Sequence, residues 1–224
     1  MNSKRKNQNR KITEAVVGIA MFAALAYGVT FVFRIPVSFL TFDAKDAVIT
    51  VASFVYGPIA GVVMSLLTAL IELFTVSGTG FYGFVMNFVS SAVFAATASG
   101  IYKLWRNPRG AVLGPVLAVL TMTGTMLLMN LWITPIYMGA PRDQVVAMIP
   151  TLLFPFNLAK GLLNAALAML LYKPLSVALS RAGLVGRGEE KKSFSWNRTS
   201  ILIAVVSLLM IAAAVILFVF LKQK

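Results

Sequence analysis

Long runs of hydrophobic residues, separated by short polar segments, account for most of the chain. Six runs cover approximately residues 15–33, 47–56, 59–76, 84–102, 111–137 and 155–179, and a seventh covers residues 201–221. Most of them are close to the roughly 20 residues that a helix needs to cross the hydrocarbon core of a bilayer. The pattern predicts an all-α integral membrane protein, with a bundle of six transmembrane helices and a further transmembrane helix at the C-terminus.

Glycine and proline divide two of these regions. Gly57 and Pro58 fall between the second and third runs, and this dipeptide favours a tight turn between two helices. Pro150 and Pro155 fall just before the sixth run, where they predict broken or re-entrant structure instead of a continuous helix.

Polar segments then divide the chain into four parts. We expect a basic cytoplasmic tail over residues 1–14, a six-helix membrane domain over residues 15–180, a polar cytoplasmic linker over residues 181–200 and the appended helix over residues 201–224. The first hydrophobic run is too long for the core of a signal peptide, so it should remain as a membrane helix. With 59% hydrophobic and 12% charged residues, the composition excludes a soluble enzyme.

The basic residues lie mainly on alternate connections. The chain has 20 Lys and Arg against 7 Asp and Glu, for a net charge of +13. Most of this charge lies in the N-terminal tail, the fourth-to-fifth connection and the segment after the sixth run. The positive-inside rule therefore predicts a multi-pass protein of the cell membrane with a cytoplasmic N-terminus. It also accounts for the charge without nucleic-acid binding, since basic flanks attract anionic lipid.

Several kinds of chemistry are excluded by missing residue types. The chain has no histidine and no cysteine, so it lacks the usual haem and zinc ligands and the common nucleophilic pairs. It also lacks a GxxxxGK[ST] phosphate loop and cannot itself hydrolyse ATP. We therefore expect no enzyme activity, no metal and no cofactor.

Lys160 is the conspicuous charge inside the sixth run. A charged residue within a span is costly and is a functional hypothesis by default. Asn157, Lys160 and Asn164 are spaced i, i+3 and i+7, which places them along one helix face. They could offer a cation and two amides to a common cavity; the alternative is that Lys160 extends to the outer membrane surface.

Other polar residues fall near the outer ends of the spans. Asn87 and Asn130 lie in the fourth and fifth runs. The first outer loop carries Thr41, Asp43 and Asp46, with the aromatic Phe42 beside the two acidic residues. These groups can converge on one outward-facing pocket, although an asparagine can also bond a neighbouring helix. Such a pocket suits a flat heteroaromatic solute with neutral hydrogen-bonding groups.

The first run carries a stripe of small residues. Ala20, Ala24 and Gly28 recur every four positions, a spacing that lets another helix approach closely. The stripe fits internal packing and a partner surface equally well.

Four segments resemble the S components, the substrate-binding subunits, of energy-coupling factor (ECF) transporters, in particular the riboflavin-binding kind. They are "FDAKDAVITVASFVYGPIAG" (residues 42–61), "SGTGFYGFVMN" (77–87), "NLWITPIYMG" (130–139) and "PFNLAKGLLNAALAMLLYKPL" (155–175). The resemblance implies a six-helix subunit that captures a vitamin from outside and works with a transmembrane T component and two cytoplasmic ATPases. It does not explain the seventh hydrophobic run.

The resemblance also assigns roles to residues. It implies that Asn157, Lys160, Asn130 and the loop from Leu40 to Asp43 contact the ligand, and that the stripe of Ala20, Ala24 and Gly28 docks on the T component. With the residues chosen from the polar pattern, the expected ligand-binding set is Leu40, Thr41, Phe42, Asp43, Asn87, Asn130, Asn157, Lys160 and Asn164. Riboflavin is the expected ligand. The alternatives are another vitamin or precursor, such as pantothenate, folate or thiamine, and a membrane-embedded enzyme acting on lipid.

Overall fold

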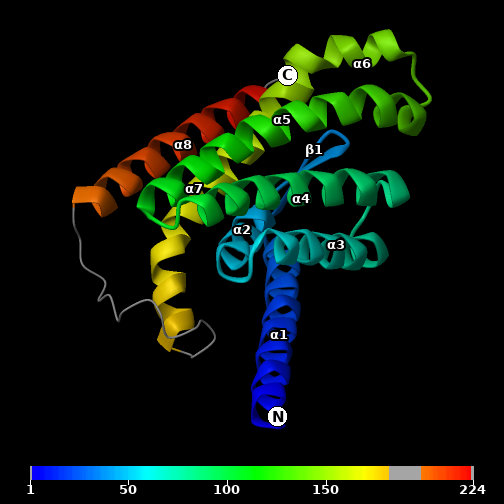
Figure 1. Ribbon diagram of the computed structural model, residues 1–224. Coiled ribbons are helices and arrows are strands. Elements are labelled where there is room, and N and C mark those ends of the chain that lie inside the picture. The colour runs from blue at the N-terminus through cyan, green and yellow to red at the C-terminus, as the bar shows by residue number, and fades with distance from the viewer. Residues whose placement is uncertain (1, 182–197, 223–224) are drawn as a thin grey trace.

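The computed structural model describes residues 2–181 and 198–222, and almost all of them are helical (Figure 1). The helices are α1 (Asn2–Val32), α2 (Lys45–Tyr56), α3 (Pro58–Thr75), α4 (Gly80–Leu104), α5 (Pro108–Met138), α6 (Arg142–Met148), α7 (Phe154–Arg181) and α8 (Arg198–Lys222). The predicted linker falls mainly on residues 182–197, outside the described residues.

Within these described ranges, six helical segments are long and apolar enough to cross a membrane. They are Gln8–Val32, Pro58–Thr75, Gly80–Leu104, Arg109–Met138, Arg142–Leu175 and Ser200–Lys222. Helix α2 has only 12 residues, but the stretch from Lys45 to Ser53 is buried inside the bundle. The expected all-α architecture is confirmed: α1, α2, α3, α4, α5 and α7 form the bundle, and α8 packs along α7.

The turn predicted at Gly57 and Pro58 is present. Helix α2 ends at Tyr56, Gly57 has φ of +94°, and α3 begins at Pro58. A positive φ is costly for residues with a Cβ, and proline is well suited to the first turn of a helix. The dipeptide therefore reverses the chain within a single residue, and α3 packs beside α2.

The connection between α1 and α2 is a β-hairpin, where the sequence predicted only a loop. Strand β1 (Arg34–Val37) pairs antiparallel with β2 (Leu40–Asp43), and Val37 lies opposite Leu40 across a two-residue turn. Ser38 in that turn has φ of +55°. The Arg34 guanidinium donates a hydrogen bond to the carbonyl oxygen of Val76, which ties the hairpin to the end of α3.

The prediction of broken or re-entrant structure before the sixth span was wrong. Helix α6 continues through a π-helical segment, η1 (Ile149–Leu153), directly into α7. Pro150 lies inside this continuous helical stretch, where its missing N–H and its ring interrupt the regular α-helical hydrogen bonds. The wider π-helical turn therefore takes the place of the predicted break.

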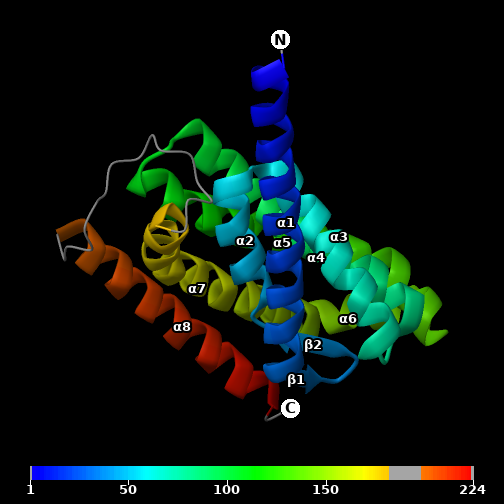
Figure 2. The same cartoon turned by 90° about the horizontal axis from the view of Figure 1, so that it is seen from below.

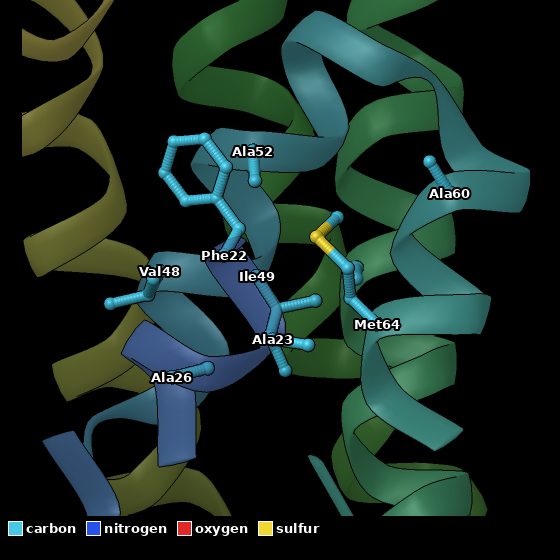
Figure 3. Packing of buried hydrophobic residues seen from close by; sticks show 9 residues of the cluster. Phe22, Ala23, Ala26, Val48, Ile49, Ala52, Ala60 and Met64 are labelled. Atoms are coloured by element: carbon cyan, nitrogen blue, oxygen red, sulfur yellow. The ribbon is translucent and has the colours of Figure 1, made fainter. Parts of the chain in front are cut away.

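Helices α1, α2 and α3 pack closely through small residues. Figure 3 shows Phe22, Ala23 and Ala26 of α1 beside residues of α2 and α3, which include Val48, Ile49, Ala52, Ala60 and Met64. Alanine side chains let helix backbones approach one another, and membrane helices use such contacts because lipid supplies no hydrophobic drive for their association. This packing fixes α2 against the rest of the bundle.

Candidate functional site

A pocket lies between the hairpin and helices α4, α5 and α7. Its walls combine amides, hydroxyls, aromatic rings and one ammonium group. The lining residues are Phe39, Leu40, Thr41, Thr79, Tyr82, Gly83, Met86, Asn87, Ser90, Met126, Asn130, Ile133, Thr134, Tyr137, Phe156, Asn157 and Lys160.

Six of the nine predicted ligand-binding residues line this pocket. They are Leu40, Thr41, Asn87, Asn130, Asn157 and Lys160. They come from four separate elements, so the fold brings together groups that the sequence placed only near the outer ends of different spans. Phe42, Asp43 and Asn164 lie outside the lining, and their contacts are described below.

The two amides on α5 and α7 are each held by their own helix. Asn130 Nδ2 donates to the carbonyl oxygen of Met126 at 2.7 Å, and the Thr134 hydroxyl donates to Asn130 Oδ1 at 2.8 Å. Asn157 Nδ2 donates to the carbonyl oxygen of Leu153 at 2.7 Å. Because a carboxamide has two N–H donors and two oxygen lone pairs, each side chain keeps hydrogen-bonding capacity for a ligand.

Lys160 is paired with a carboxylate of the hairpin. Its Nζ donates to Asp43 Oδ2 at 2.9 Å, and both side chains are buried. Since an unpaired charge is expensive away from water, this contact explains how a lysine is tolerated at this depth. Lys160 therefore does not extend to the membrane surface, which was the alternative, because its side chain is buried against Asp43.

The ion pair continues behind the pocket. Lys45 Nζ lies 3.7 Å from Asp43 Oδ2 and donates to both carboxylate oxygens of Glu72 at 2.7 Å. We call Asp43, Lys45, Glu72 and Lys160 the buried charge network. Asn87 Nδ2 donates to Glu72 Oε2 at 3.2 Å, so the network joins two pocket-lining side chains, Lys160 and Asn87.

Asn164 connects α7 to the start of α2. Its Nδ2 donates to the carbonyl oxygens of Asp43 and Lys160 at 2.9 Å and 3.0 Å, and its Oδ1 accepts from the backbone N–H of Ala47 at 2.9 Å. The side chain is fully buried. Its amide therefore bonds to the protein on both its nitrogen and its oxygen. Asn164 lies seven residues, or about two turns, beyond Asn157 on the same face of α7.

Phe42 also faces away from the pocket. Its ring centroid lies 6.1 Å from that of Phe156 in α7 and 5.1 Å from that of Phe218 in α8. Asp43 thus ties the hairpin to α7 and Phe42 packs it against α7 and α8, while Leu40 and Thr41 of the same strand line the pocket.

Three aromatic residues of the lining contact one another. Tyr137 lies 6.3 Å from Phe39 and 6.0 Å from Tyr82, measured between ring centroids. Neither Tyr82 nor Tyr137 was among the predicted ligand-binding residues. The structure adds them to the pocket wall, where flat rings suit a flat solute.

The other missed residues could have been found by helical spacing. Met126, Thr134 and Tyr137 lie four residues before, four after and seven after Asn130, so they share its face of α5. Ser90 follows Asn87 by three residues on α4 in the same way. Residues spaced three, four or seven positions from a predicted asparagine share its helix face, and they include many of the other lining residues.

The side chains that line the pocket are suited to binding a solute. Of the described residues that line it, Lys160 is the only one with a charged side chain, and Asp43 compensates that charge. No cluster of three or more histidine, cysteine, aspartate or glutamate residues that could hold a metal occurs in the part of the chain that the structure describes. The site therefore offers hydrogen bonds and aromatic contacts to an uncharged solute.

The small-residue stripe of α1 faces outward. Ala20 and Ala24 are exposed, whereas Phe22, Ala23 and Ala26 are buried in the bundle. A Cβ added at Gly28 would meet nothing within 4 Å. Ala20 and Ala24 therefore do not pack inside the bundle that the described residues form, and Gly28 is half-buried.

Comparison with known proteins gives consistent similarities. Residues 14–172 match the family described as "ECF transporter, substrate-specific component". The chain is 30% identical to the riboflavin transporter RibU of Staphylococcus aureus (strain TCH60) over 191 residues, which is 81% of this chain and 100% of that protein. It is 25% identical over 180 residues to RibU of Streptococcus thermophilus (strain ATCC BAA-250 / LMG 18311), covering 75% of this chain and 85% of that protein.

A solved structure is also similar. Its title is "Structure and mechanism of the S component of a bacterial ECF transporter", and it matches with a TM-score of 0.64 at 30% identity. The match covers 78% of this chain and 99% of that chain.

Proposed function

The chain belongs to the substrate-specific components of ECF transporters, and we propose that the solute held by its pocket is riboflavin. Membership in this family makes the protein a transport subunit and excludes the alternative of a membrane-embedded enzyme. Both curated relatives described above are named riboflavin transporters, which supports the choice of ligand.

The observation that carries this proposal is the composition of the pocket. Riboflavin has a flat ring system edged with carbonyl and N–H groups and a chain of hydroxyls, and it is uncharged at neutral pH. Asn87, Asn130 and Asn157 supply donors and acceptors, and Tyr82 and Tyr137 supply flat apolar surface. Lys160 can donate a charge-assisted hydrogen bond while Asp43 keeps the site close to neutral.

The other parts of the transporter must supply energy, because the sequence has no phosphate-binding loop. We propose that a T component docks against the outward face of α1 at Ala20, Ala24 and Gly28, and that two cytoplasmic ATPases drive the cycle. Exposed small residues allow a second helix to approach closely, which supports this position for the partner.

We also propose that the N-terminus is cytoplasmic and that the pocket opens outward. Helix α1 begins at one end of the molecule, and the hairpin follows at its opposite end (Figure 2). The basic residues before α1 favour the cytoplasm for the first of these ends. A solute would then enter from outside, beside the hairpin.

The test is direct because flavins absorb visible light and fluoresce. Protein purified from cells grown in rich medium should be yellow, and ligand-free protein should quench the fluorescence of added riboflavin at a one-to-one ratio. Colourless protein that fails to quench riboflavin, but is stabilised against heat by pantothenate, folate or thiamine, would keep the family and change the ligand.

A further inference from the structure

Helix α8 lies wholly outside the family match, which ends at residue 172. We infer that α8 holds the β-hairpin against the pocket, with Phe218 and Leu221 as positioning residues that slow the release of the bound solute. This inference rests on the proposed function, because it assumes that the pocket holds a solute whose exit the hairpin limits.

The position of α8 is specified by a seam of buried residues. Ser207, Ala214 and Leu221 are buried and recur every seven residues, while Leu208 and Ile216 are exposed. A seven-residue repeat keeps one face of a helix against its neighbour, and small residues allow a close approach. Since α8 packs along α7, this helix has one defined face toward the bundle (Figure 2).

The last turns of α8 reach the hairpin. Leu221 is buried in one hydrophobic cluster with Val37 of β1, Phe42 of β2 and Phe156 of α7, and Leu217 and Phe218 pack against that cluster. The ring centroids of Phe42 and Phe218 lie 5.1 Å apart. Figures 1 and 2 both place the C-terminal end of α8 on the side of the molecule that carries the hairpin.

These contacts lie directly behind residues of the pocket. Leu40 and Thr41 line the pocket, and Phe42 follows them in the same strand. Successive side chains of a strand point to opposite faces, so Thr41 projects from the face opposite Phe42. Leu40 is on the same face as Phe42, where it lines the pocket and also packs against the cluster that contains Leu221. Because a hairpin of two four-residue strands has little stability of its own, an external support should limit its movement.

The experiment compares variants of the full chain in lipid nanodiscs. Phe218→Ala and Leu221→Ala remove the support, Phe218→Tyr keeps the ring, and Ile216→Ala is the matched control on the exposed face of α8. The dissociation rate of riboflavin is measured from the recovery of flavin fluorescence after dilution into an excess of non-fluorescent competitor. Hairpin movement is measured with a spin label at Ser38→Cys, and the absence of native cysteine makes this label specific.

The expected result is a dissociation rate raised about two- to tenfold in Phe218→Ala and Leu221→Ala, the range set by the loss of an aromatic or aliphatic contact. The label at position 38 should also become more mobile in these two variants, with and without riboflavin. Phe218→Tyr and Ile216→Ala should match the parent in both measurements.

Three results would overturn the inference. The first is a parental dissociation rate and label mobility in Phe218→Ala and Leu221→Ala. The second is faster dissociation with an unchanged label, since α8 would then act by another route. The third is an equal effect of Ile216→Ala, which would indicate general destabilisation. If the parent itself fails to bind riboflavin, the proposed function fails, and the label without ligand still decides whether α8 restrains the hairpin.

Discussion

Lys160 Nζ and Asp43 Oδ2 lie 2.9 Å apart, although the two residues are separated by 117 positions in the sequence. The contact joins α7 to the end of the hairpin, and both side chains are almost fully enclosed. Removing one member of such a buried pair leaves the other charge unpaired, which is far more costly than removing both. Lys160 therefore serves the fold as well as the pocket, and the two roles can be separated.

The first prediction separates them with a single and a double variant. Lys160→Met should weaken riboflavin binding, because Asp43 loses its closest cation. It should lower the free energy of unfolding by less than the roughly 3–5 kcal/mol of a fully uncompensated buried charge, because Lys45 stays 3.7 Å from Asp43. Adding Asp43→Asn should restore most of the stability but not the affinity. Thermal unfolding and fluorescence titration measure the two quantities. Normal affinity in the double variant would remove Lys160 from the binding site.

The second prediction concerns the asparagines of α7. Asn157→Ala should weaken riboflavin binding by on the order of 1 kcal/mol with little change in stability, because Asn157 lines the pocket. Asn164→Ala should instead lower the free energy of unfolding by about 1–3 kcal/mol, because it leaves the backbone N–H of Ala47 without its partner. Riboflavin affinity should therefore fall more in Asn157→Ala, and the free energy of unfolding, measured with a chemical denaturant, should fall more in Asn164→Ala. Equal losses of affinity would place Asn164 in the site after all.

The third prediction separates binding from transport. Ala24→Trp adds bulk to the outward stripe of α1, so it should block close approach of a T component while the isolated protein binds riboflavin normally. Leu208→Trp, at an exposed position of α8, is the control and should support normal uptake. Riboflavin uptake by cells and binding by purified protein provide the two measurements. Full uptake by Ala24→Trp would show that partners dock elsewhere.

The fourth prediction concerns the charge of the ligand. Riboflavin 5′-phosphate should bind roughly tenfold or more weakly than riboflavin, since an added phosphate finds only Lys160, whose charge Asp43 already compensates. Competition titrations against riboflavin give the ratio of the two affinities. A phosphate ester that binds as tightly as riboflavin would contradict the neutral character of the pocket.

Local patterns in the sequence predicted the bundle, the turn at Gly57 and the polar face of α7. They could not predict the depth of a residue along that face. Asn157 and Asn164 share the face, but seven residues of helix separate them by about 10 Å, which takes Asn164 past the pocket. The depth depends on where α2 and the hairpin cross α7, and that is a tertiary relationship.

The pairing of Asp43 with Lys160 could not be predicted either, because it also depends on tertiary packing. In the sequence, Asp43 lies near Lys45 and far from Lys160, and Glu72 belongs to another helix. Only packing of the hairpin end between α2 and α7 brings these charges together. The same packing decides that Phe42 faces α8 and that Thr41 faces the pocket.

The π-helical segment Ile149–Leu153 sets the rotational phase of the long helical stretch that contains it. Each residue of a regular α-helix advances the direction of its side chain by about 100°. Val145, before the segment, is fully buried, and Asn157 and Lys160, after it, line the pocket. A π-helical turn takes up one more residue than a regular turn, so deleting one residue from it would give a regular α-helix with these two faces still in phase. The same deletion in the regular helix between Val145 and Asn157 would put the two faces out of step by about 100°.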